Sequence, residues 1–174
     1  VASSAMLDVL AVDVPPAARA LAAAFWPGAL TIILRAQPTL TWDLGETAGT
    51  VALRMPDHEV ALDLLRATGP LAVSSANRTG QAAATSAQAA HEQLGARVAR
   101  YLDDGEAPGG QASTIVDATT AELTIVREGA LSREQLAAIV PHLRASAPAV
   151  GESAPDQSAP PETAPPETAP PEPA

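Results

Sequence analysis

Apolar residues along this chain follow two different spacings, and the alternation between them predicts its secondary structure. Short runs rich in Val, Ile and Leu indicate strands, which we expect at 29–34, 50–54, 71–74, 98–102, 113–116 and 123–126. Longer stretches with apolar residues three or four positions apart indicate helices, which we expect at 15–25, 57–67, 85–94 and 132–143. Because strands and helices are interleaved, the pattern predicts an α/β layer fold with a largely buried sheet.

Polar residues predict where these helices begin. Asp13 and Asp57 are expected to cap the first two helices, since a side-chain oxygen at this position accepts a hydrogen bond from a free backbone N–H. A Ser or Thr followed three residues later by Gln forms a capping box. The segments Thr85–Gln88 and Ser132–Gln135 have this spacing and predict the starts of the last two helices.

The composition changes sharply after Arg144. Residues 145–174 hold nine of the 17 prolines, five acids and no base, and they repeat Ala-Pro-Pro-Glu-Thr. With nothing large to bury, such a segment cannot offset the entropy lost on ordering. We expect a folded domain at 1–144 and a disordered acidic, Pro-rich tail at 145–174. A recognition motif for a proline-binding partner is the alternative for the tail.

Charge and composition exclude several classes of function. The ten bases, all of them Arg, and the 20 acids give a net charge of −10, which argues against broad electrostatic binding to nucleic acid or anionic membranes. The absence of Cys excludes a disulfide scaffold, a thiol nucleophile and a Cys-ligated zinc site. No apolar run approaches the roughly 18–20 residues of a membrane span. We therefore expect a cytoplasmic protein without a membrane partner.

A polar cluster follows the predicted strand at 71–74. The segment Ser74–Gly80 contains small hydroxyls, an amide and a glycine, which let backbone N–H groups approach an anion, and Arg78 could add charge. Ligands of α/β sheets bind beyond the ends of such strands. The alternative is an ordinary Ser/Asn/Gly turn.

A second cluster, Pro108–Asp117, combines two glycines with a Ser-Thr pair that opens a strand. It lacks the Gly-Lys-Ser/Thr core of a phosphate-binding Walker loop, and a hairpin-like turn is the alternative. The preceding acids Asp103, Asp104 and Glu106 could hold Mg²⁺ or form a solvated turn.

Two arginines end apolar strands, and each offers a planar fork suited to a carboxylate or phosphate. They are Arg54 and Arg127, and an edge position or a structural ion pair is the alternative for each. The three histidines lie in predicted helices without a catalytic spacing, and no Gly-x-Ser-x-Gly segment is present. These dispersed polar residues indicate binding and positioning of a nucleotide, and they identify no catalytic residue.

Five short segments of the chain occur in a fixed order between about residues 10 and 143. They are Trp26–Leu34, Thr50–Pro56, Ser74–Gly80, Ser113–Asp117 and Arg127–Gly129. Together they resemble the YrdC-like domain of threonylcarbamoyl-AMP synthases. The resemblance implies a YrdC-like fold, which is a twisted mixed sheet flanked by helices.

The resemblance also implies an activity, that of an L-threonylcarbamoyladenylate synthase. Such a nucleotidyltransferase joins L-threonine, bicarbonate and ATP into threonylcarbamoyl-AMP and releases pyrophosphate. A separate transferase then moves the threonylcarbamoyl group to an adenosine of tRNA. Mg²⁺ is implied together with ATP, without a metal ligand from the protein.

By the same resemblance, several residues would bind the two larger substrates. The candidates for ATP are Thr50, Asn77, Thr85 and Arg127, and those for L-threonine are Arg54, Ser75 and Ser113. Thr31 is a further candidate. Thr85 could also cap its helix, since helix N-termini favour anions.

One part of the family pattern has no counterpart in this chain. The family opens with a Thr-x-Thr-x-Tyr-Gly-Leu segment and a Lys-x-Arg motif, and a chain without lysine cannot contain the second. We therefore expect an N-terminally truncated domain whose activity is lower than that of a chain extended upstream. The alternatives are a catalytically impaired fragment that binds nucleotide or double-stranded RNA, and a truncated product without function.

Overall fold

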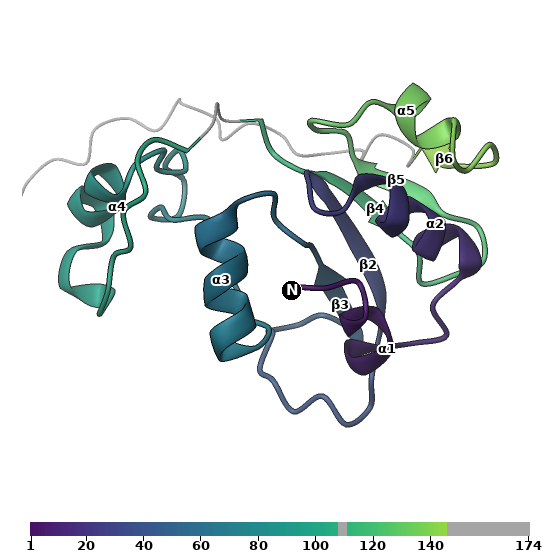
Figure 1. Cartoon of the computed structure of the whole chain (residues 1–174), viewed down its shortest axis with the longest axis horizontal. Coiled ribbons are helices and arrows are strands. Elements are labelled where there is room, and N and C mark those ends of the chain that lie inside the picture. Colours follow the sequence, from purple (N-terminus) through teal and green to yellow (C-terminus); the bar gives the residue numbers. More distant parts are fainter. Residues whose placement is uncertain (108–110, 146–174) are drawn as a thin grey trace, which may run out of the picture.

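A computed structural model describes residues 1–107 and 111–145 of this protein (Figure 1). A six-stranded mixed sheet forms its centre, in the order β1-β2-β4-β5-β6, and β3 also pairs with β2. The strands are β1 (Ala11–Val12), β2 (Leu30–Ala36), β3 (Thr50–Leu53), β4 (Thr114–Asp117), β5 (Thr124–Arg127) and β6 (Arg144–Ala145). The helices are α1 (Met6–Leu10), α2 (Pro16–Phe25), α3 (Glu59–Thr68), α4 (Ala87–Leu94) and α5 (Arg133–Ala137), and a 3₁₀ turn, η1, covers Gly95–Arg97.

β2 is the strand around which the sheet is organised. It pairs antiparallel with β1 and β3 and parallel with β4, and β4 then pairs antiparallel with β5. Along β2, Leu30, Ile32 and Leu34 are fully buried, while the residues between them are more exposed. This period of two gives the sheet one core face and one open face.

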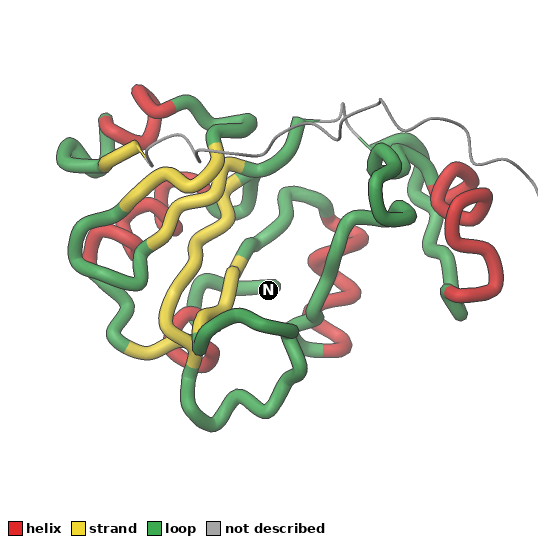
Figure 2. The backbone as a smooth tube through the Cα atoms, turned by 180° about the vertical axis from the view of Figure 1, so that it is seen from behind, coloured by secondary structure: helices red, strands yellow, loops and turns green. Residues whose placement is uncertain are grey.

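The hydrophobic core lies between the core face of the sheet and the helices α1, α2 and α5. Leu7, Leu21 and Leu136 represent these helices in one continuous cluster of buried side chains with the β2 residues. Burying one such side chain contributes roughly 1.5–3 kcal/mol. The helix α2 lies in front of the strands in Figure 1 and behind them in Figure 2, so Figure 2 looks onto the open face.

Most of the predicted elements are confirmed. Four of the six expected strands form β2, β3, β4 and β5, and the first three expected helices form α2, α3 and α4. The capping box Ser132–Gln135 is present at the start of α5, with both of its reciprocal hydrogen bonds. That helix ends at Ala137, earlier than expected. The mixed sheet flanked by helices confirms the expected fold class. The expectation of a largely buried sheet is wrong, because the helices of the core cover one face and leave the other open.

Three expected helix caps are wrong, two of them by one residue. Thr85 does not cap α4, because the hydroxyl of the next residue, Ser86, accepts the hydrogen bond from Ala89 N–H at 3.1 Å. Asp57 does not cap α3, because His58 takes the extended conformation of the cap and its Nδ1 accepts from a backbone N–H at 3.4 Å. For α2, Pro15 occupies the cap position instead of Asp13, and no side chain caps the helix.

Two expected strands are wrong. The segments 71–74 and 98–102 pair with no other strand of the described chain. Their apolar side chains are largely exposed, with 87% for Val73 and 67% for Leu102. A strand needs a neighbour that accepts and donates its backbone hydrogen bonds, and an apolar run alone does not supply one.

Four short elements were not expected from the sequence, namely α1, β1, β6 and the 3₁₀ turn η1. Each has two to five residues, which is too short to show a hydrophobic period. No helix of the described chain is long and apolar enough to cross a membrane. The tail expected at 145–174 lies outside the described residues except for its first residue, as does part of the Gly-rich cluster that begins at Pro108.

Candidate functional site

The open face of the sheet carries four of the residues expected to bind substrates, together with Thr31. Its members alternate with the buried residues of each strand, or directly flank a strand, and are Thr31, Ile33, Arg35, Thr50, Ala52, Arg54, Ser113, Ile115, Asp117, Thr124 and Arg127. The three arginines outnumber the single acid on this face. The face is therefore locally basic in a chain whose net charge is −10, and it favours an anionic ligand.

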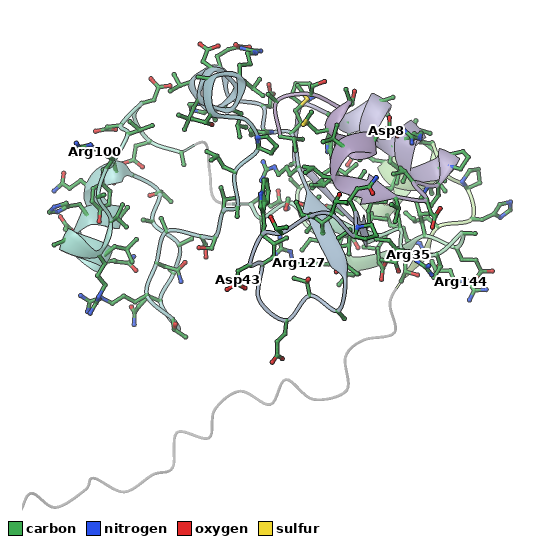
Figure 3. All side chains as sticks on the ribbon, turned by 90° about the horizontal axis from the view of Figure 1, so that it is seen from below. Asp8, Arg35, Asp43, Arg100, Arg127 and Arg144 are labelled. Carbon is green, nitrogen blue, oxygen red and sulfur yellow. The ribbon has the colours of Figure 1, made fainter. Side chains whose placement is uncertain are left out.

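Backbone register places Thr31 and Arg127 in one row across the sheet. Thr31 lies opposite Ile115 in the parallel pair β2–β4, and Ile115 lies opposite Arg127 in the antiparallel pair β4–β5. A register shift beside Ile115 adds one residue to β5 at this point. Such a bulge re-aims a side chain, and here it leaves Arg127 on the open face (Figure 3).

Thr31, Ser113 and Arg127 form one hydrogen-bonded cluster. The hydroxyls of Thr31 and Ser113 are 2.8 Å apart. The Arg127 guanidinium donates to the Ser113 carbonyl through Nε at 3.2 Å and Nη2 at 2.8 Å, and Nη2 also lies 3.3 Å from the Ser113 hydroxyl. The cluster thus places a fixed guanidinium beside two hydroxyls, which suits recognition of an oxyanion with a neighbouring polar group.

Arg54 extends from the same face, directly after β3. Its Nε donates to the Gly28 carbonyl at 2.9 Å, and the Gly28 N–H donates to the Met55 carbonyl at 2.8 Å. A Cβ at position 28 would lie 2.5 Å from the Phe25 carbonyl oxygen, so the close approach of residue 28 to Phe25 requires glycine. No partner is found among the described residues for the terminal nitrogens of Arg54, which leaves them for a carboxylate.

Thr50 lies at the far end of β3. Its hydroxyl donates to the Thr47 carbonyl at 2.8 Å, within the loop that joins β2 to β3. That loop encloses a depression of about 260 Å³, which Thr50 lines together with Trp42. A larger depression, of about 410 Å³, lies between 121–123 and 140–144 and contains none of the expected site residues.

The remaining candidates, Ser75, Asn77 and Thr85, lie in the loop before α4. The Ser75 carbonyl accepts from the Asn77 N–H at 3.1 Å, and the Thr85 carbonyl accepts from the Ala107 N–H at 2.7 Å. No hydrogen bond of the described chain joins this loop to the open face. The structure therefore separates the expected site residues into two groups.

One of the two polar atoms of the Asn77 side chain has hydrogen-bond partners, and the other has none among the described residues. Its amide nitrogen donates to the carbonyls of Arg78 and Gln81, both at 2.9 Å. Its Oδ1 is buried and is the single such side-chain atom without a partner among the described residues. Arg78 does not face this atom, since its Nε donates to the Gln93 carbonyl at the end of α4. This hydrogen bond uses one of the three guanidinium nitrogens of Arg78 and leaves its positive charge in place.

A family model matches residues 1–129 of the chain, about three quarters of its length. It is the model of the Sua5, YciO and YrdC proteins, which carries the description telomere recombination. The chain belongs to the Sua5/YciO/YrdC family. The matched range contains every residue that the sequence assigned to a substrate.

Individual proteins are also similar to this family member. A Mycobacterium tuberculosis protein is 47% identical over 134 residues, covering 77% of the chain and 62% of that protein. The threonylcarbamoyl-AMP synthase of Pyrococcus abyssi is 34% identical over 154 residues, covering 88% of the chain and 45% of that protein. The crystal structure of P. abyssi Sua5 complexed with L-threonine superposes with a TM-score of 0.79 at 35% identity, over 84% of this chain and 43% of that one. This chain thus spans less than two thirds of the length of these relatives.

Two of the acids that could hold Mg²⁺ in this family member contact different partners. Asp104 Oδ2 lies 3.6 Å from His58 Nε2, and Asp103 accepts from the Gly105 N–H at 3.0 Å. Across the described part of the chain, no group of three or more His, Asp or Glu side chains is arranged to hold a metal ion. Asp103 thus closes a turn with Gly105.

The sequence did not reveal what holds the Ser113–Arg127 contact in place. Gly129 packs on the backbone of Ser113, where a Cβ at position 129 would lie 2.7 Å from the Ser113 carbonyl oxygen. The partners are 16 residues apart in sequence, and a lone glycine after a strand gives no signal of such a contact.

Proposed function

We propose that this chain forms the substrate-binding part of an L-threonylcarbamoyladenylate synthase. The reaction joins the threonine amine to the carbon of bicarbonate and links the resulting carbamate to the α-phosphate of ATP, with water and pyrophosphate as the products that leave. The observation that carries the proposal is the Thr31–Ser113–Arg127 cluster on the basic open face, with Arg54 on the same face directly after β3. The names of the relatives support it.

L-Threonine would bind on the open face between Arg54 and Ser113. The threonine carboxylate needs a cation with two parallel donors, and the terminal nitrogens of Arg54 supply that geometry. The Ser113 hydroxyl, 2.8 Å from that of Thr31, can exchange this bond for one to the ligand. Ser75 would reach the ligand from the loop before α4.

ATP would be held by Arg127, Thr50, Asn77 and Thr85. Two of the three guanidinium nitrogens of Arg127 are used on Ser113, and Nη1 is directed to the phosphate chain in this proposal. The orphaned Oδ1 of Asn77 requires a donor, and leaving such an acceptor unpaired typically costs about 1–3 kcal/mol. An amino or hydroxyl group of the nucleotide would supply that donor.

Mg²⁺ would reach the site on the phosphates of ATP, where it would offset their negative charge. The described residues offer no protein donor set for it. The preorganised cations of the chain, Arg54 and Arg127, are then the groups that this protein itself aims at the charge of the substrates. The product would be consumed by a separate transferase that moves the threonylcarbamoyl group to tRNA.

A pyrophosphate-release assay tests the proposal. The purified chain is mixed with ATP, Mg²⁺, L-threonine and bicarbonate, and each component is omitted in turn. We expect release to depend on all of them and to fall strongly in Arg54→Ala and Arg127→Ala. Arg19→Ala is the matched control, because this arginine lies on α2 and pairs with Asp8, away from the open face. Release without threonine, or equal loss in the control, would overturn the proposal.

A further inference from the structure

The side chain of Thr114 is fully buried and uses all of its hydrogen-bonding capacity. Its hydroxyl donates to the Leu131 carbonyl at 2.7 Å. The same oxygen accepts from the N–H groups of Gly129 at 2.9 Å and Leu131 at 3.0 Å. A hydroxyl offers one donor and two acceptor sites, so one atom ties β4 to the whole turn that follows β5.

This turn lies directly on the start of β4. Besides the contacts of Thr114, the Ala130 N–H donates to the Ala112 carbonyl at 3.0 Å. Gly129 approaches the backbone of Ser113 so closely that no other residue fits without a shift. The hydroxyl of Thr114 thus links the two segments, and the missing side chain of Gly129 lets their backbones come this close.

The same two segments carry substrate-site residues on the opposite face of the sheet. Side chains alternate along a strand, so Ser113 faces the open side while Thr114 faces the core. Arg127 immediately precedes the turn that Thr114 binds, and its guanidinium rests on the Ser113 carbonyl at 2.8 Å. A change in the spacing of the segments therefore alters the direction of the guanidinium.

We propose that Thr114 is a positioning residue that holds Arg127 against Ser113 and thereby aims the Arg127 guanidinium at the anionic substrate. It acts through Arg127 and touches no substrate itself. The inference rests on the proposed function for the identity of the ligand, and on the contacts above for its geometry.

The test compares Thr114→Val, which keeps the shape and loses the hydroxyl, with Thr114→Ser, which keeps the hydroxyl. The first readout is the solvent exchange of the Arg127 Nε–H in the ligand-free chain, followed by NMR. The second is the dissociation constant of ATP from calorimetry, measured for both variants alone and combined with Arg127→Ala. Should the Val variant fail to fold, Thr114→Cys against Thr114→Ser makes the same comparison at nearly equal size.

In Thr114→Val we expect the Arg127 Nε–H to exchange faster. We also expect ATP to bind about tenfold more weakly, which corresponds to the loss of one hydrogen bond from Arg127 to the substrate. Thr114→Ser should restore both, and Thr114→Val should add no further loss once Arg127 is Ala. A folded Val variant with unchanged exchange and unchanged affinity would overturn the inference. If the unaltered chain does not bind ATP, the proposed function fails, while the exchange readout still decides whether Thr114 fixes Arg127.

Discussion

The sheet region and the region from α3 to residue 107 are built on different principles. In the sheet region, buried side chains from α1, α2, α5 and the strands form one core. In the second region, Leu62, Leu65 and Ala90 are buried outside that core, and the exposed large apolar side chains are Val60, Leu64, Leu71, Val73 and Leu102. Figures 1 and 2 both show α3 and α4 standing away from the strands. The comparison shows that the basic open face rests on a packed scaffold, while Ser75, Asn77 and Thr85 depend on local hydrogen bonds.

Removing apolar volume from each region tests most strongly whether the two regions differ in packing. Ile32→Ala should lower the free energy of unfolding by about 2–5 kcal/mol, because it leaves a cavity at a fully buried site. Val73→Ala should change it by less than about 0.5 kcal/mol, since that side chain is 87% exposed. Chemical denaturation of both variants measures the difference. Equal losses would show that segment 71–74 is packed in the folded protein.

Ligand affinities should separate the two substrates across the site. Arg54→Ala should weaken L-threonine more than ATP, whereas Arg127→Ala and Asn77→Ala should weaken ATP more than threonine. A lost hydrogen bond to a charged group costs about 1.5–3 kcal/mol, so losses of roughly ten- to a hundredfold are expected for the arginines. Calorimetric titration with each ligand measures them, with Arg19→Ala as the control. Equal losses for both ligands in all three variants would contradict the assignment.

Adjacent hydroxyls before α4 distinguish a structural from a binding role within the second region. Ser86→Ala should cost about 1 kcal/mol of stability, the usual effect of losing an N-cap. Thr85→Ala should leave stability nearly unchanged and weaken ATP binding. Thermal unfolding and ATP titration of the two variants give the comparison. A stability loss confined to Thr85→Ala would show that the cap is one residue earlier.

The smallest expected effect concerns the exposed link between α1 and α2. The hydrogen bond from Arg19 lowers the pKa of the Asp8 carboxyl below its usual range. Because this pKa is depressed in the folded state, the stabilisation is present above the carboxyl's unfolded pKa and fades as the pH falls through the folded value. The melting temperature of Asp8→Asn should thus lie slightly below that of the unaltered chain at pH 7 and converge with it once the pH has fallen below the depressed pKa of Asp8. A constant difference between the two would exclude this titration.

Local sequence patterns predicted those elements whose stabilising contacts lie close in the sequence. The alternation in β2 and the spacing Ser132–Gln135 are such patterns, and both are confirmed. The strand expected at 71–74 failed because pairing depends on a neighbour that an apolar run does not specify. Thr85 and Ser86 are equally good caps by type, and the backbone conformation decides between them.

The candidate site was predictable only in part. The resemblance supplied Ser113 and Arg127 as separate candidates, and the structure joins them by hydrogen bonds. The structure does not bring Ser75, Asn77 or Thr85 onto the same face. The role of Thr114 was hidden, since its partners lie 15 and 17 residues away and a buried threonine in a strand is ordinary.

Titration of the isotope-labelled chain with L-threonine, followed by NMR, tests whether the open face of the sheet binds this substrate. The open face should respond, so the largest shifts are expected at Thr31, Arg54, Ser113 and Arg127, with no comparable change in α4. Glycine, which shares the carboxylate and lacks the hydroxyl, should bind more weakly at the same residues. Shifts confined to α3 and α4, or to the depression between 121–123 and 140–144, would contradict the account, as would the absence of any shift at saturating threonine.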